Sequence, residues 1–148
     1  MHVEGAFTVR RDRLSVYAFF IDARRLVDCL DDPHTVEVAD ETHFSGTVTT
    51  GVAFIRGTFR VSGEYTVRAG PERVVAQLHG AGLGSGLDAT IATELAEANG
   101  VTTVRWKADL TFSGPIASIG ERIVRGTVDK KTQGLFERAR QRLEAGGP

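Results

Sequence analysis

The sequence is poor in cysteine, and it lacks any long run of apolar residues. Its single cysteine, Cys29, excludes an internal disulfide and a metal site built from cysteine thiolates. So little cysteine is typical of a protein of the reducing cytoplasm. The longest apolar run, from Val16 to Ile21, is far too short to cross a bilayer, so we expect neither a transmembrane helix nor a secretory leader.

The sequence also lacks a strong excess of either charge. Its formal net charge is −1 over 148 residues, which argues against nucleic-acid binding by the whole domain. Hydrophobic residues make up 41% and charged residues 25%, the balance of an ordinary globular protein. A chain of this length favours a single domain, which we place at residues 1–144, with residues 145–148 as a frayed tail.

Alternation of apolar and polar residues dominates the middle of the chain. In the clearest example, Trp106 and Phe112 fall on one face while Arg105 and Lys107 fall on the other, which is typical of a strand with one buried face. Short connections between such segments favour an antiparallel meander. The expected strands are Val3–Val9, Thr35–Ala39, His43–Thr50, Gly57–Arg68, Arg73–Gly80, Gly86–Leu95 and Val101–Phe112.

Helical periodicity is confined to the two ends of the sequence. Asp12 is a good N-cap for a helix over Arg13–Ile21, and Asp22 for a second short helix reaching Cys29. Residues Pro115–Glu144 carry a wide apolar stripe and predict one long helix, roughly 45 Å in length. We therefore expect an α+β fold: a curved seven-stranded antiparallel sheet, two short helices between its first and second strands, and a long C-terminal helix covering the apolar face.

The sequence offers no arrangement typical of a catalytic, metal or cofactor site. Adjacent acidic pairs flank one expected strand and fit solvated turns. The glycine run Gly80–Gly86 lacks the spacing of a phosphate-binding loop and leads into a strand rather than a helix. We expect no catalytic residue, no metal and no cofactor. The histidines lie on different expected elements without metal-ligand spacing: His2, His34, His43 and His79.

The apolar faces of the sheet and of the long helix are the strongest functional signal. They are rich in aromatic and medium-sized aliphatic side chains, and glycines interrupt the helix. One interpretation is an ordinary filled core. The other is a cavity between sheet and helix that binds an apolar ligand. The residues expected to line or border that cavity are Phe59, Tyr65, Leu87, Ile91, Trp106, Phe112, Ile116, Ile119 and Ile123.

A second signal is apolar bulk in an expected turn. Phe54 and Ile55 lie between glycines, next to Arg56, where polar residues are usual. Such a tip suits a cavity entrance, a partner surface or a membrane contact. The basic end of the long helix, with Arg138 and Arg142, suits the same contact, and a solvated helix face is the alternative.

Several segments together resemble a known family. The pattern from Val3 to about Leu143 resembles START-like domains, the polyketide cyclase and lipid-transport superfamily, and within it the G-subunit family of carbon monoxide dehydrogenase. The segments that carry the resemblance are Val16-Tyr17, Phe20, Asp22, Leu26 and Cys29; Gly51 with Thr58-Phe59-Arg60; Gly80–Gly86 followed by Asp88-Ala89; and Ile116-Ala117, Ile119-Gly120, Arg122 and Ile123.

The resemblance implies a helix-grip fold with an apolar cavity under the C-terminal helix. It also implies an accessory role to a molybdenum carbon monoxide dehydrogenase, in membrane attachment or quinone handling. The leading hypothesis is thus a non-catalytic cytoplasmic module that binds a lipid or quinone, serves an oxidoreductase and touches the inner face of the membrane. The alternatives are a cyclase- or hydrolase-type enzyme using the same cavity, and a protein-interaction adaptor with a filled core.

Overall fold

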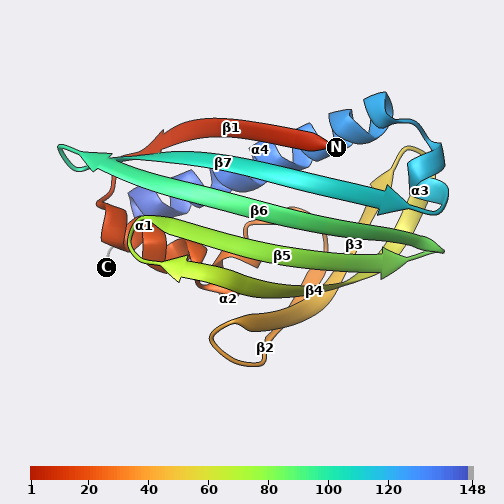
Figure 1. Ribbon diagram of the computed structural model, residues 1–148, viewed down its shortest axis with the longest axis horizontal. Helices are drawn as coiled ribbons and strands as arrows, with labels where there is room; N and C mark the ends of the chain where they lie inside the picture. Colours follow the sequence, from red (N-terminus) through yellow and green to blue (C-terminus); the bar gives the residue numbers. More distant parts are fainter. Residues whose placement is uncertain (147–148) are drawn as a thin grey trace.

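The computed structural model describes residues 1–146. The strands are β1 (His2–Val9), β2 (His34–Val38), β3 (His43–Val52), β4 (Ile55–Ala69), β5 (Arg73–Gly82), β6 (Ser85–Ala98) and β7 (Val101–Ser113). The helices are α1 (Arg13–Phe20), α2 (Ala23–Val27), α3 (Pro115–Ser118) and α4 (Glu121–Ala145). Figure 1 shows their order along the chain.

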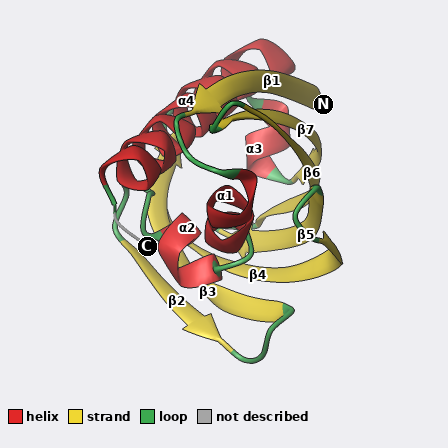
Figure 2. Cartoon of the chain, turned by 90° about the vertical axis from the view of Figure 1, so that its left-hand side faces the viewer, coloured by secondary structure: helices red, strands yellow, loops and turns green. Residues whose placement is uncertain are grey.

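The strands form one antiparallel sheet in the order β1-β7-β6-β5-β4-β3-β2. The sheet curves into a trough, and α4 runs along the gap between its two edges (Figure 2). The short helices α1 and α2 sit inside one end of this trough (Figure 2). This arrangement confirms the expected α+β fold, its seven strands and the position of the two short helices.

Side-chain caps start both short helices where the sequence predicts. The carboxylate of Asp12 accepts a hydrogen bond from the Ser15 backbone N–H at 3.0 Å. The carboxylate of Asp22 accepts one from the Arg25 backbone N–H at 3.3 Å. Each cap satisfies an amide that the first helical turn leaves without an intrahelical partner. The apolar face of α1 is thereby fixed against the sheet, with Phe19 1% exposed.

The long C-terminal helix is interrupted, contrary to the expectation of one helix from Pro115 to Glu144. The single turn α3 ends at Ser118, and α4 begins at Glu121. Between them Gly120 has φ +108°, a value that no α-helix accommodates and that favours glycine. The apolar stripe continues across this break, so periodicity alone did not reveal it. Gly120 is a turn that redirects the chain, not a helical position.

The packed core gathers toward the two ends of the trough. At the end that holds α1, a cluster includes Phe19, Val104 and Leu143, each 1% exposed or less. At the end that holds α3, Ile116 packs with Ile55 and Val124. A third cluster, Val3, Trp106 and Ala108, lies where β1 and β7 face α4. These clusters hold α4 over the trough along its length.

The C-terminus is ordered further than expected. Ala145, which we assigned to a frayed tail, is the last residue of α4, and the Gly146 N–H donates to the Arg142 carbonyl at 2.8 Å. Gly147 and Pro148, the rest of that expected tail, lie outside the described residues. Within residues 1–146, none of the helices combines the length and the hydropathy needed to span a bilayer.

Candidate ligand-binding cavity

A cavity of about 300 Å³ lies between the concave face of the sheet and α4. Strands β3 to β6 form its floor, α1, α2 and β2 border it, and Leu135 and Phe136 of α4 cover it. The side chains that line it are mostly Val, Leu, Ile, Phe and Ala. Known ligand pockets occupy about 300–1,000 Å³, so the space suits one small apolar molecule.

Burial of the inward side chains changes along the trough. Val61, Leu78 and Leu87, on the concave face of the central strands, are only partly buried. By contrast, Leu95 on β6 and Val104 on β7 are 4% and 0% exposed at the α1 end. Interior side chains of a filled core pack as densely as an organic crystal. The trough is therefore packed at its ends and hollow in between.

An aromatic group closes the cavity under α4. The ring of Phe136 lies 5.1 Å from the rings of both Phe7 and Trp106 and 6.2 Å from that of Phe20, measured between centroids. These separations are typical of favourable aromatic pairs, which adds specificity to the packing of α4. Phe136 thus forms part of the cavity wall on one side and packs against β1 and β7 on the other.

The polar groups inside the cavity are few and uncharged. The Tyr65 hydroxyl donates to the Phe20 carbonyl at 2.8 Å, which ties β4 to the end of α1. Burial raises the pKa of Tyr65 far above its usual value, so the phenol stays neutral. Thr93, on β6, is 5% exposed and also lines the cavity.

Ionic contacts tie α4 to the segment between α2 and β2. The Lys131 ammonium lies 2.8 and 2.7 Å from the two carboxylate oxygens of Asp32. The Arg142 guanidinium lies 3.3 Å from Asp28, and the Arg138 guanidinium donates to the Cys29 carbonyl. These contacts fix the cover of the cavity along the side formed by α2 and β2.

Three of the residues predicted to line a ligand site border this cavity: Tyr65, Leu87 and Ile91. The others lie elsewhere. Phe59, Phe112, Ile116 and Ile119 belong to the packed cluster around α3, and Trp106 belongs to the cluster between β7 and α4. Ile123 points outward and is 52% exposed, because the break at Gly120 sets a new helical phase for α4.

Sequence reasoning missed the side of the cavity formed by the helices and by the edge of the sheet. Leu135 and Phe136 stand over the floor, and Phe20, Leu26 and Phe44 border it. Leu135 falls within the predicted apolar stripe of the long helix, and that stripe was the available signal. Nothing in a periodic pattern distinguishes positions above a hollow from positions above packed side chains.

The residues predicted to touch a membrane or a partner fall into two groups. Phe54 is 87% exposed at the β3–β4 turn, and Arg56 beside it is exposed. Ile55, expected in the same exposed tip, is instead 9% exposed, because it faces inward and packs with Ile116. Arg138 and Arg142 contact their own chain, as described above.

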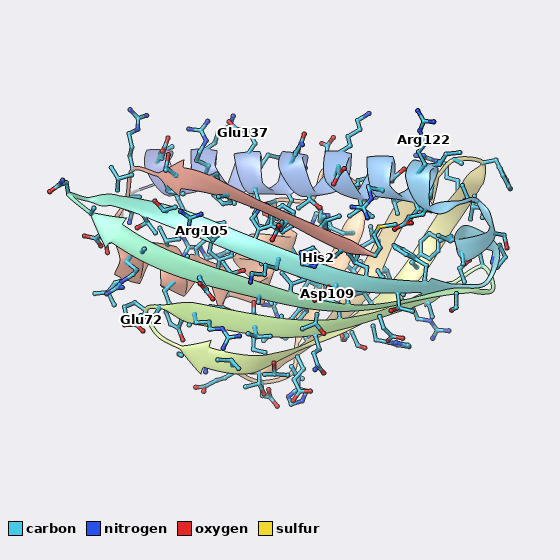
Figure 3. All side chains as sticks on the ribbon, turned by 45° about the horizontal axis from the view of Figure 1, so that its top comes forward. His2, Glu72, Arg105, Asp109, Arg122 and Glu137 are labelled. Carbon is cyan, nitrogen blue, oxygen red and sulfur yellow. The ribbon has the colours of Figure 1, made fainter. Side chains whose placement is uncertain are left out.

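The histidines lie on or near the surface, paired with carboxylates. On the neighbouring strands β1 and β7, His2 Nδ1 lies 2.8 Å from the Asp109 carboxylate (Figure 3). On β5 and β6, His79 Nδ1 lies 2.6 Å from the Asp88 carboxylate. Hydrogen bonding to Asp109 raises the pKa of His2. Within the described residues, no three histidine, cysteine, aspartate or glutamate side chains come together in a group that could hold a metal ion. Cys29 is fully buried, and burial raises the pKa of its thiol.

Solved structures share this architecture at low sequence identity. A conserved protein from Geobacillus kaustophilus is 17% identical, with a TM-score of 0.89 over 97% of this chain and 95% of its own. A START superfamily protein from Mycobacterium smegmatis is 9% identical, with a TM-score of 0.78 over 97% of both chains. A protein from Thermus thermophilus is 12% identical, with a TM-score of 0.74 over 100% of both chains. The fold is therefore START-like.

Sequence comparison identifies the family within this fold. No curated protein matches the chain significantly. Residues 5–144, nearly the whole chain, match the family of CoxG, the G subunit of carbon monoxide dehydrogenase, which confirms the resemblance drawn from the separate segments. The chain belongs to this CoxG family.

Proposed function

We propose that the protein is a non-catalytic binding module that holds an apolar molecule, a lipid or a quinone, in the cavity beneath α4. It passes this ligand to an oxidoreductase of the carbon monoxide dehydrogenase type at the cytoplasmic face of the membrane. The family and the START-like fold support a ligand-binding module. The choice of ligand, the partner enzyme and the location are our proposal.

One observation carries the proposal: central-strand side chains such as Leu78 and Leu87 face a space that protein atoms leave unfilled. Apolar surface of this kind gains about 25 cal/mol for each Å² that a ligand removes from water. The polar groups of the lining are uncharged hydroxyls and backbone, so the driving force for binding is hydrophobic.

An enzyme using the same cavity requires a group that moves protons or attacks a substrate. Cyclase- or hydrolase-type chemistry would need a carboxylate or histidine aimed into the cavity, whereas the residues that line it include neither. Tyr65 supplies a phenol whose proton is already donated to the Phe20 carbonyl. The geometry favours binding over catalysis.

Native mass spectrometry of gently purified protein tests the proposal. We expect an adduct that leaves on collisional activation and that organic extraction identifies as an apolar small molecule. We also expect delipidated protein to bind ubiquinone-1 or hexadecanol saturably, at one molecule per chain. A mass spectrum without any adduct, together with no saturable binding of either compound, would overturn the proposal.

Filling the cavity from within separates specific binding from surface adsorption. Ile91→Trp directs an indole into the cavity, because Ile91 lines it from β6. Thr90→Trp places the same indole on the exposed face of the same strand. We expect the first variant to lose at least about tenfold in affinity and the second to bind normally. Equal affinities for the two variants would place the ligand outside the cavity.

The end of the molecule that carries α3 supports the membrane part of the proposal. Phe54 and Leu83, at the tips of the β3–β4 and β5–β6 turns, are 87% and 52% exposed. Both turns lie at the same end of the sheet (Figure 1). Arg56 is exposed next to Phe54. Exposed apolar tips beside a cation suit shallow insertion into an anionic lipid surface.

Co-sedimentation with vesicles of phosphatidylcholine and phosphatidylglycerol tests this contact. Phe54→Ser should lower vesicle binding by roughly tenfold, because the variant loses the free energy gained when a phenyl ring moves from water into lipid. Leu14→Ser is the matched control, because Leu14 is 68% exposed on α1 at the opposite end of the trough. If the two substitutions have equal effects, the tip is not the contact.

A further inference from the structure

The cavity wall contains no ionisable side chain that carries charge near neutral pH. Its members are aliphatic and aromatic residues, glycines, a few hydroxyl residues and the neutral Tyr65. An ionised carboxylate moved into such surroundings without a partner loses several kcal/mol of solvation. A fatty acid or another organic anion would therefore have to leave its charged group outside.

Three cations of α4, on the side of the cavity formed by α2 and β2, are already engaged by other groups. Lys131 holds both oxygens of Asp32, and Arg142 pairs with Asp28. The Arg138 guanidinium is bound to the Cys29 carbonyl. An anionic head group that pairs with Lys131, Arg138 or Arg142 would have to displace one of these contacts. The cavity and the contacts along this side both disfavour a negatively charged ligand.

Thr93 provides the hydrogen-bonding group that such a site needs. Its side chain is 5% exposed and lines the cavity from the middle of the sheet. Unlike the Tyr65 hydroxyl, the Thr93 hydroxyl makes no hydrogen bond to the protein within residues 1–146. Protein atoms do not enclose its oxygen completely. A buried hydroxyl is costly when it has no partner, so a ligand that displaces water from this part of the cavity binds better if one of its atoms accepts the hydrogen bond.

We propose that the cavity selects an uncharged apolar molecule that carries a carbonyl or ether oxygen, and that the Thr93 hydroxyl donates a hydrogen bond to this oxygen. The inference rests on the proposed function and names the chemical class of its ligand. Thr93 acts as a specificity-determining residue: the apolar walls supply affinity, and the hydroxyl fixes which end of the ligand lies at β6.

A series of ligands that share one ring system tests the selection against charge. Naphthalene, 2-acetylnaphthalene and 2-naphthoate differ only in one substituent, and each is titrated calorimetrically into delipidated full-length protein near pH 7. The ketone should bind at least about tenfold more tightly than the carboxylate, because the carboxylate is buried without a partner. A carboxylate that binds as tightly as the ketone would overturn the selection.

Substitutions at two threonines of β6 test the hydrogen bond. Thr93→Val keeps the shape of the side chain and removes the hydroxyl. It should lower the affinity for 2-acetylnaphthalene by about three- to tenfold. Naphthalene has no acceptor, so its affinity should rise or stay within about twofold. Thr90→Val, on the exposed face of β6, should change the affinity for neither ligand. Thr93→Ser keeps a hydroxyl and should bind the ketone more tightly than Thr93→Val does.

The outcomes separate this inference from the proposed function. If Thr93→Val weakens both neutral ligands equally, or neither of them, Thr93 does not recognise the ligand and that part of the inference fails. Ketone binding by the wild type with a carbonyl infrared band unshifted from its value in hydrocarbon would contradict the hydrogen bond even if Thr93→Val did not fold. If the wild type binds ubiquinone-1 or hexadecanol but neither naphthalene nor 2-acetylnaphthalene, this inference fails and the proposed function stands. If it carries no adduct and binds none of these compounds, the proposed function itself fails.

Discussion

At the scale of single residues, Tyr65 links the stability of the fold to the candidate site. Its ring lines the cavity and lies 5.6 Å from the ring of Phe44, while its hydroxyl reaches the Phe20 carbonyl at the end of α1. A buried carbonyl that loses its partner is costly. The same side chain therefore shapes the cavity and fixes α1.

Replacing Tyr65 by phenylalanine should lower the free energy of unfolding by about 1–3 kcal/mol, because the buried Phe20 carbonyl is left without its donor. Urea denaturation measures the change. Tyr17→Phe is the control, because the Tyr17 hydroxyl makes no hydrogen bond within the described residues, and it should change stability by less than about 0.5 kcal/mol. If both substitutions lower the free energy of unfolding equally, the hydrogen bond from Tyr65 to Phe20 does not account for the loss.

Asp40 is the second informative residue, because it organises the β2–β3 turn. Its carboxylate accepts hydrogen bonds from the backbone N–H groups of Thr42 and His43, each at 2.8 Å. The hydrogen bond from the Thr42 backbone, together with the contact to His43, lowers the pKa of Asp40 to about 2. Because this folded-state pKa lies below the usual value of 3.8, the stabilisation is complete above about pH 4 and is lost as the pH falls toward 2.

Asp40→Asn should accordingly lower the melting temperature at pH 7, and the difference from wild type should shrink as the pH falls from about 4 to 2. Differential scanning calorimetry across this range measures it. Asp31→Asn, at an exposed carboxylate in the loop before β2, should leave the melting temperature unchanged. A difference that does not depend on pH would show that the Asp40 charge is not the cause.

At the scale of elements, α4 bridges two edges of a sheet and contains glycines at positions that do not need them. A Cβ atom built on Gly126 would meet nothing within 4 Å. The three atoms nearest to a Cβ built on Gly134 all belong to the guanidinium of Arg138, the far end of a long side chain. Neither glycine therefore permits a close approach to the sheet. Outward-facing positions of α4, such as Arg122 and Glu137, project away from the sheet (Figure 3).

Gly126→Ala should stabilise the protein by about 0.5–1 kcal/mol, because alanine has the higher helix propensity and the space is open. Gly120→Ala should destabilise it by about 1–3 kcal/mol, because alanine at φ +108° is strained. Thermal unfolding of the two variants measures the pair of opposite effects. Stabilisation by both substitutions would contradict the break between α3 and α4.

The elements were largely predictable from the sequence, and the exception is instructive. Alternation was clearest in β4 and β7, which have one face toward the trough and one toward water. It was weaker in β5, ambiguous in the threonine-rich β3, and short in β2. Asp12 and Asp22 marked both short helices through their capping chemistry. The break at Gly120 was not predictable, because Ile116, Ile119 and Ile123 keep a helical spacing across it. A glycine can be a helical residue or a turn, and only the backbone shows which.

At the scale of the whole molecule, the protein is a trough packed at both ends and hollow in the middle. Alternation identified which residues face inward, and for Tyr65, Leu87 and Ile91 this was enough to place them at the cavity. It could not place Trp106 or Phe112, which face the same side but meet packed neighbours. Whether an inward side chain meets protein or space depends on the path of α4, a long-range property that no local pattern contains.

The most direct test of the unfilled cavity is anomalous X-ray scattering from crystals of the protein pressurised with xenon, because dry apolar cavities bind this gas. We predict a xenon peak between Leu87 and Ile91 on the floor and Leu135 on α4. The same crystals of Ile91→Trp should lack the peak. Wild-type crystals in which side chains pack across this space, with no xenon bound there, would contradict a ligand cavity beneath α4.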